Sequence, residues 1–393
     1  MPDRTYRAIY NCDGDNLYIH GEHPLRTIYN CDGNNLFIHG TDVITKEEVE
    51  RYVDMAVDRD ITTFFMSCHC GQDMNTRGQT YELAGDRLTD DEYRALADPE
   101  VAKPNTGERG VVACRQLIAQ GHDPLGIVLD RAKEKGKETF ITFRLNEVHG
   151  VEDPGSYALS RFWLDHPEWH VGTPGDRLPD LHMEILGPVH PIVQTWIPGG
   201  LDFAVPEVRE HTLAQIEEMC RHYGIEREPT IDGLDLDFQR FPIYFRFGEE
   251  AAGIPLMNDF IRKIRAITDA VGDERGRPFL LSARIMAKPE QNRALGLDPF
   301  AWVEEGLLDF VTVAHYLRNQ FTLPVREYRA LFPPDLPIYA SIEYAPDADT
   351  YRQLARDLWR EEPDGIMLFN FFAGNPPPYD VIDEIVDRER MVG

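Results

Sequence analysis

Eight short apolar segments, separated by amphipathic segments of helical periodicity, constrain the fold of this chain more than any other feature of its sequence. We expect strands within residues 28–40, 62–67, 139–145, 233–238, 279–285, 310–314, 338–342 and 365–369. Helices are expected between them, for example at Pro206–Tyr223, Pro255–Val271 and Thr350–Arg360. This alternation predicts a parallel sheet of the α/β class, and eight such strands close naturally into a (β/α)8, or TIM, barrel. An open doubly wound sheet is the alternative fold, but no glycine-rich phosphate loop follows the first strand.

A duplicated motif precedes the barrel. Residues Ile9–Gly21 recur, with two changes, as Ile28–Gly40. Only one copy can supply the first strand, and the second copy is followed by Thr45-Lys-Glu-Glu, a typical capping box at the start of a helix. We therefore predict an N-terminal extension at 1–27 and a single barrel domain at 28–393.

The composition restricts the partners. The chain has 393 residues, 42% of them hydrophobic, and a net charge of −28. Such an acidic surface argues against nucleic acid and anionic membranes as partners. No apolar run approaches the roughly 20 residues of a membrane-spanning helix, and no signal peptide is visible. Six cysteines without a regular framework are typical of reduced thiols, so we expect a cytoplasmic protein; its oligomeric state stays open.

Two connections are unusually long, at Cys68–Leu125 after the second strand and Val148–Phe203 after the third. Loops of this length are commonly functional. Both leave the carboxyl ends of strands, where barrel enzymes build their sites.

Carboxylates at two strand ends are the main catalytic candidates. In Asp232-Gly-Leu-Asp-Leu-Asp-Phe-Gln239, strand alternation places Asp235, Asp237 and Gln239 on the face opposite the apolar residues, so they should point into the barrel. Glu343 ends the seventh strand segment. Glycoside hydrolysis needs two carboxyl groups that face one bond, which Asp237 and Glu343 could supply. The alternative is a structural role for Asp235 and Asp237, bonded to Arg240 or Arg284.

Other polar and aromatic residues fall near the same strand ends and are candidates for substrate binding. They are Arg144, Asn146, Glu147 (also a spare candidate acid), Trp169, Arg240, Arg284, His315, Tyr316 and Asn370. Any single histidine or aromatic side chain is more often structural. We expect no cofactor and no catalytic metal, because Cys68-His69-Cys70 lacks a second matching pair and the first strand has no His-x-His.

Several segments resemble bacterial family-10-like glycosyl hydrolase proteins. They are Ile28-Tyr-Asn-Cys-Asp-Gly, Phe162-Trp-Leu-Asp-His-Pro-Glu-Trp169, Leu201-Asp-Phe-Ala-Val-Pro-Glu-Val-Arg209, Asp232–Pro242 and Gly365-Ile-Met-Leu-Phe-Asn-Phe-Phe372. The resemblance covers nearly the whole barrel and implies a carbohydrate substrate, but it does not specify the sugar.

The fourth strand segment is also similar to the chitinase-type Asp-x-x-Asp-x-Asp-x-Glu pattern, matched at Asp232, Asp235 and Asp237. The position of that family's proton donor is Gln239 here, and an amide cannot act as an acid. We therefore expect a glycoside hydrolase with Asp237 as acid/base, Glu343 as nucleophile or its partner, and Asp235 tuning Asp237. The alternatives are a carbohydrate-binding barrel without catalysis, and a lyase or metal-assisted hydrolase on the same fold.

Overall fold

Eight parallel strands close into one barrel, as the sequence predicts, with β1 hydrogen-bonded to both β2 and β10. A computed structural model describes residues 26–33, 36–38, 43–186, 191–371 and 378–393. The barrel strands are β1 (Arg26–Cys31), β2 (Thr63–Ser67), β5 (Glu138–Arg144), β6 (Gly233–Asp237), β7 (Leu280–Met286), β8 (Phe310–Ala314), β9 (Ile338–Ile342) and β10 (Gly365–Phe369). The first strand lies at the start of the second motif copy and begins at Arg26, two residues before the predicted boundary. The first copy lies outside the described residues.

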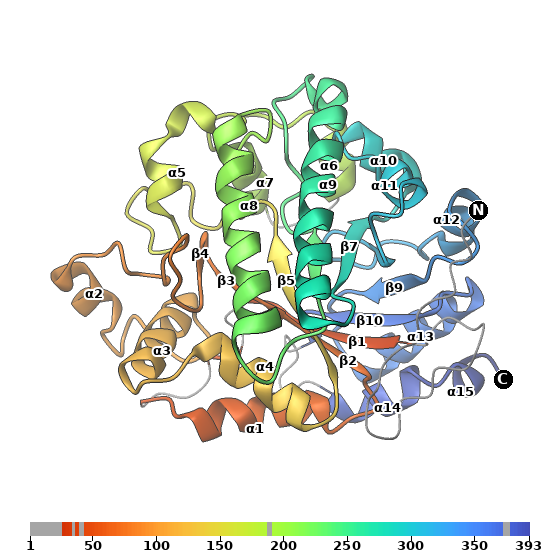
Figure 1. Ribbon diagram of the computed structural model, residues 1–393, viewed down its shortest axis with the longest axis horizontal. Helices are drawn as coiled ribbons and strands as arrows, with labels where there is room; N and C mark the ends of the chain where they lie inside the picture. The colour runs from red at the N-terminus through yellow and green to blue at the C-terminus, as the bar shows by residue number, and fades with distance from the viewer. Residues whose placement is uncertain (1–25, 34–35, 39–42, 187–190, 372–377) are drawn as a thin grey trace.

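Helices surround the barrel, and α8 and α9 lie side by side on one flank (Figure 1). The larger helices are α1 (Lys46–Val57), α3 (Gly107–Ala119), α4 (Pro124–Glu134), α8 (Pro206–Arg221), α9 (Glu250–Arg275) and α13 (Ala348–Arg360). Shorter helices are α2 (Asp90–Leu96), α5 (Arg161–Asp165), α6 (Asp180–Leu186), α7 (Pro191–Trp196), α10 (Pro289–Ala294), α11 (Pro299–Glu304), α12 (Val325–Leu331), α14 (Ile382–Ile385) and α15 (Arg388–Val392). Among the described residues, no helix is both long and apolar enough to cross a membrane.

Local capping accounts for several helix boundaries. The predicted capping box starts α1, where Glu48 N–H donates to Thr45 Oγ1 over 3.3 Å and Thr45 N–H donates to Glu48 Oε2 over 2.9 Å. Helix α9 begins five residues before the predicted Pro255 and holds this proline inside its length. As the sixth residue of the helix, Pro255 has no N–H to donate to the carbonyl oxygen of Ala251, so one bond of the regular helical ladder is missing there.

The two long connections are built from short elements rather than irregular chain. The connection after β2 forms a hairpin, β3 (His69–Cys70) with β4 (Asp73–Met74), followed by α2 and α3. The connection after β5 contains α5, the short 3-10 helices η1 (Pro167–Trp169) and η2 (Ile197–Gly199), and α6 and α7. Both lie beside the carboxyl ends of the strands (Figure 1).

Side chains that point into the barrel form three layers of increasing polarity. The lowest layer is an apolar cluster that is separate from the outer core: Ile28, Phe65, Phe140, Phe310, Tyr339 and Met367. Two residues further along, seven of the eight strands contribute to a buried polar layer: Asn30, Ser67, Thr142, Asp235, Ser282, Thr312 and Ser341. The uppermost layer is charged and contains Arg144, Asp237, Arg284 and Glu343. The polarity therefore rises toward the end at which barrel enzymes work.

Candidate functional site

Asp237 lies at the centre of the charged layer. In the strand register it is paired with Arg144 of β5 on one side and with Arg284 of β7 on the other. The Arg284 guanidinium donates to both carboxylate oxygens, over 2.9 Å from Nε and 3.0 Å from Nη2. The backbone N–H groups of Gln239 and Arg240 donate to Oδ1 over 2.9 and 3.1 Å. Burial alone would raise the pKa of Asp237, but the positive charge of Arg284 and its hydrogen bonds hold that pKa below its usual value.

Glu343 extends from the end of β9 toward the same guanidinium. Its Oε1 accepts from Arg284 Nη1 over 3.2 Å and from Ser341 Oγ over 2.9 Å. Its Oε2 is buried and has no hydrogen-bond partner in the described structure. Burial raises the pKa of Glu343 to about 7, although Arg284 opposes the shift. At neutral pH this carboxyl group therefore holds a proton for a large part of the time.

The pKa values of the two carboxyl groups are shifted in opposite directions. Since both contact nitrogens of one guanidinium, they lie within the roughly 10 Å that separates the carboxyl groups of glycosidases. One is held ionised and the other is held close to half-protonated. Pairs of titratable groups whose pKa values are driven apart are typical of acid–base sites.

Asp235 occupies the polar layer beneath this pair. Its Oδ1 accepts from Ser282 Oγ over 2.7 Å, whereas its buried Oδ2 has no hydrogen-bond partner among the described residues. Burial raises the pKa of Asp235 to about 7, and the nearby charge of Asp237 adds to the shift. Asp235 is therefore placed to influence Asp237, as the sequence hypothesis requires, but its catalytic role remains a prediction.

A second charged network lies beside the pair, between β1, β5 and the segment after β6. Arg144 forms ion pairs with Asp32 and, over 2.7 Å, with Glu147. The other oxygen of Glu147 contacts the His149 ring, whose Nε2 is 3.0 Å from Arg240 Nη2. Burial opposes the ionisation of Glu147, but His149, Arg144 and Arg240 more than compensate and hold its pKa far below the usual value. Glu147 is therefore poorly suited to the role of spare acid.

Three further candidates differ in how their polar groups are used. Asn146 donates to the carbonyl oxygens of Leu201 and Ile243 over 2.9 and 2.6 Å and accepts from Leu201 N–H, so its amide holds the connection after β5. His315 Nε2 is 2.8 Å from the carbonyl oxygen of Phe321. Trp169 stacks on His166, with ring centroids 3.5 Å apart, and packs against the outer core.

Two candidates keep free hydrogen-bonding capacity. The hydroxyl of Tyr316 and Oδ1 of Asn370 are buried without a partner in the described structure. Asn370 also has a left-handed backbone, with φ of 55°, directly after β10, and Leu317 has φ of 59° close behind β8. Non-glycine residues in this region are uncommon and gather at functional sites.

Gln239 makes hydrogen bonds that a glutamate carboxylate at this position could not make. Its amide nitrogen donates to the carbonyl oxygens of Ile285 and Ala314, over 2.7 Å each, and so joins the ends of β7 and β8. Its Oε1 is buried without a partner and lines a cavity of about 200 Å³ together with His315 and Tyr316. The departure from the chitinase-type pattern therefore has a local structural reason.

Sequence reasoning missed several members of the site. Ser282 and Ser341 are inward-facing residues two positions before the identified Arg284 and Glu343, so strict period-two counting along each strand would have found them. Asp32 lies two positions after the inward-facing Asn30, which the sequence analysis did not single out. His149 and Asn319 lie on connections, where no periodicity applies; Asn319 accepts from Glu343 N–H over 3.0 Å. Among the described residues, no three His, Cys, Asp or Glu side chains come together as a group that could hold a metal.

A scan against protein-family models and a search of curated proteins gave no match, so membership of the family-10-like group remains a prediction. Several solved structures are similar in fold. A noncanonic maltogenic alpha-amylase from Thermotoga neapolitana is 12% identical, covers 94% of this chain and 77% of its own, and has a TM-score of 0.46. A glycoside hydrolase family 18 N-acetylglucosaminidase from Paenibacillus barengoltzii is 10% identical over 92% and 99% of the two chains, with a TM-score of 0.42. An alpha-galactosidase from Thermus thermophilus is 13% identical over 94% and 63%, with a TM-score of 0.44. At these identities and TM-scores the similarities do not bear on the activity of this chain.

Proposed function

We propose that this chain hydrolyses a glycosidic bond, with Glu343 as the general acid and Asp237 as the ionised carboxylate. The observation that carries the proposal is the geometry at the carboxyl end of the barrel, where Arg284 donates twice to Asp237 and once to Glu343. The opposite directions of the two pKa shifts support it. These roles reverse the sequence hypothesis, in which Asp237 was the acid. The reversal follows from the guanidinium, which contacts Asp237 twice and Glu343 once.

In this mechanism the Glu343 proton moves to the glycosidic oxygen as its bond to the anomeric carbon breaks. In one course Asp237 bonds to that carbon, and water, deprotonated by the now ionised Glu343, then attacks the carbon and releases Asp237. In the other course Asp237 removes a proton from a water that attacks the carbon directly. Spacings of about 5–5.5 Å and about 6.5–9.5 Å distinguish the retaining and the inverting course. Asp235 would act through the pKa of Asp237.

Substrate must first reach the pair, because Asp237 and Glu343 are each 0% exposed. Arg284 makes one 3.2 Å hydrogen bond to Glu343 and two shorter ones to Asp237, so the bond to Glu343 would break when substrate binds. Buried polar atoms without partners would then meet sugar hydroxyls: Nε of Arg144 and Arg240, the hydroxyl of Tyr316 and Oδ1 of Asn370.

The test is turnover on a panel of oligosaccharides and aryl glycosides. Glu343→Gln should reduce turnover of oligosaccharides by about 10²–10⁴-fold, since it removes general acid catalysis. It should largely keep turnover of dinitrophenyl glycosides, whose leaving group departs without a proton. Asp237→Asn should lose turnover of both substrates. Glu304→Gln, on the exposed face of α11, is the matched control and should behave as wild type.

Equal turnover of oligosaccharides by wild type, Glu343→Gln and Asp237→Asn would end the two-carboxylate mechanism. If instead Asp237→Asn kept turnover of dinitrophenyl glycosides and Glu343→Gln lost it, Asp237 would be the general acid.

A second candidate is a carbohydrate-binding barrel without catalysis. The full burial of both carboxyl groups favours it, as does the structural use of Gln239. Isothermal titration of the same oligosaccharides distinguishes the two functions: binding by wild type without turnover of any substrate in the panel would favour the second.

A further inference from the structure

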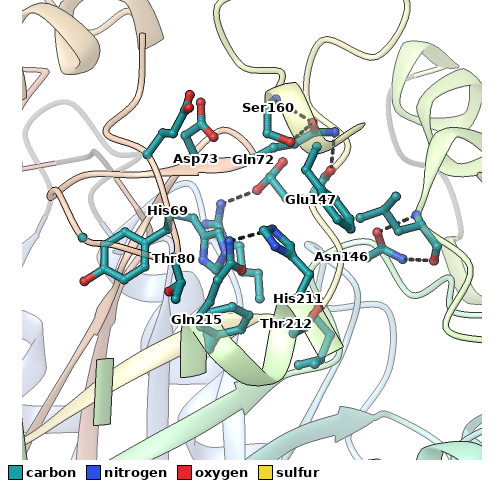
Figure 2. A pocket seen from close by; sticks show the side chains of 18 of the residues that line it. His69, Gln72, Asp73, Thr80, Asn146, Glu147, Ser160, His211, Thr212 and Gln215 are labelled. Atoms are coloured by element: carbon teal, nitrogen blue, oxygen red, sulfur yellow. Dashed lines mark hydrogen bonds and ion pairs between the residues drawn. The ribbon is translucent and has the colours of Figure 1, made fainter. Parts of the chain in front are cut away.

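A cavity of about 340 Å³ lies at the rim of the barrel, beside the carboxyl end of β5, and residues 143–147 form part of its wall (Figure 2). Its walls come from the β3–β4 hairpin, from residues 78–82, from the start of α5 and from α8. Figure 2 shows Asp73 and Thr80 on one side and His211 and Gln215 of α8 on another. Asp237 and Glu343 are not among its lining residues, so it is separate from the proposed catalytic pair.

The wall at residues 78–82 is tied to helix α8. The Glu218 carboxylate accepts from the backbone N–H of Gln79 over 2.6 Å and from that of Thr80 over 2.7 Å. Gly78 lies so close to the Tyr81 ring that a Cβ atom at this position would be 2.3 Å from it. These contacts hold Tyr81 against the cavity in a fixed position, so the cavity is preformed.

Asp73 is the unusual residue of this cavity. It is 5% exposed, lines the cavity, and its Oδ2 has no hydrogen-bond partner in the described structure. Glu82 lines the same cavity, and its Oε2 is likewise without a hydrogen-bond partner there. A buried carboxyl oxygen without a donor costs free energy comparable to a lost hydrogen bond, so a site that keeps two of them is suited to a ligand that supplies donors.

The nearby arginines are engaged elsewhere. The Arg87 guanidinium donates to the backbone carbonyl oxygens of Leu159, Gly155 and Ser156. Arg161 Nε is 3.5 Å from Glu82 Oε2, an ion pair too long and poorly aligned to count as a hydrogen bond. Within the described residues, neither arginine forms an ion pair with Asp73, and their charges act on it only from a distance.

We propose that this cavity binds a small organic cation, whose ammonium group donates to Asp73 and Glu82. The aromatic rings of Tyr81 and Phe162 line the same space, and aromatic faces attract alkylammonium groups. An organic cation is preferred to a metal ion because the described residues offer no group of three metal-ligating side chains. The proposal does not require the catalytic one, although Arg144 of the charged layer also lines this cavity.

Binding should be linked to proton release. Burial holds the pKa of Asp73 well above its usual value, and the charges of Glu82 and Asp86 raise it further against Arg87 and Arg161. An ammonium group bound beside Asp73 would favour the ionised carboxylate and oppose this shift. The affinity for a cation should rise with pH over the range in which Asp73 ionises.

The experiment is calorimetric titration of the full chain with two cations, D-glucosamine and 1,4-diaminobutane, and with their neutral counterparts D-glucose and 1,4-butanediol. At least one cation should bind, its neutral counterpart should not, and buffers of different ionisation enthalpy should show proton release. Asp73→Asn should weaken binding by about ten- to a hundredfold and abolish the proton release. This substitution removes an unpartnered carboxyl group, so the variant should fold.

Glu82→Gln tests the second carboxyl group and should weaken binding less, because its side chain is 42% exposed. Glu304→Gln on α11, far from the cavity in the chain, is the matched control and should bind as wild type. Equal affinity of wild type and Asp73→Asn would overturn the proposal. So would the absence of heat with both cations at millimolar concentration, or equal binding of a cation and its neutral counterpart.

Discussion

Gln239→Glu gives a direct test of how the site is built, because it restores the acid of the chitinase-type pattern. The wild-type amide nitrogen donates to the carbonyl oxygens of Ile285 and Ala314 at 2.7 Å, and the residue is 1% exposed. A carboxylate placed there faces two acceptors and donates to neither. Each buried carbonyl left without its donor costs about 1–3 kcal/mol, so the loss should be about 2–6 kcal/mol at neutral pH.

The loss should depend on pH. Burial beside two carbonyl oxygens and the Asp237 carboxylate raises the folded-state pKa of the introduced carboxyl group above the unfolded value of about 4.3. A raised pKa means that stability is highest below the unfolded pKa and falls as the pH rises through the folded one. In the protonated form the group can still donate one hydrogen bond, so the variant should lose less stability at pH 4 than at pH 8.

Urea unfolding followed by tryptophan fluorescence measures this effect. With a slope of about 3 kcal/mol/M, the midpoint should fall by roughly 0.7–2 M at neutral pH. Gln320→Glu is the matched control: it lines the same cavity but is exposed, and its midpoint should not move. A Gln239→Glu variant as stable as wild type at both pH values, or one that gains glycosidase activity, would refute the structural role assigned to Gln239.

Two further predictions concern the charged layer. Asp235→Asn should gain stability relative to wild type as the pH rises from about 4 to about 7. The pKa of Asp235 is raised to about 7 in the folded wild type, so wild type releases this proton on unfolding in that range and loses stability as the pH rises. Thermal unfolding across this range measures the difference, and parallel plots of stability against pH for the two proteins would contradict the prediction. Arg284→Met should destabilise the fold by about 3–5 kcal/mol, since it leaves the Asp237 and Glu343 carboxyl groups buried without their shared cation. Urea unfolding measures the loss, with Arg293→Met at the surface as the control. Equal unfolding midpoints for the two variants would contradict the prediction.

The fold followed from the sequence because each barrel strand carries its own signal. The segment 338–342 matches β9 at both ends, and the inward direction of Asp235 and Asp237 follows from the apolar alternation around them. The partner of Asp237 was also among the two arginines considered, and it is Arg284. Period-two alternation is local, so it can be counted without knowledge of the tertiary structure.

The assignment of roles could not be reached in that way. Whether Asp237 or Glu343 keeps a proton depends on which of them the Arg284 guanidinium contacts twice, and that is set by the register between β6 and β7. The bonds of Gln239 to the ends of β7 and β8 also depend on strands that are distant in sequence. The cavity beside α8 joins residues from the β3–β4 hairpin and the segment after it, the end of β5, the start of α5, Leu201 and α8. These segments are distant in sequence and share no motif from which their proximity could be predicted.

The layered barrel interior has a practical consequence for protein engineering. The apolar ring formed by residues such as Phe65, Phe140 and Phe310 packs the inside of the closed barrel, four residue positions below the charged layer. A library that randomises exposed positions of the connections, while keeping that ring and the paired charges above it, should therefore retain a high fraction of folded members. One that randomises the ring should lose folded members whatever residues stand in the connections. The positions open to change thus lie on the connections, and the inward positions of the strands must be kept.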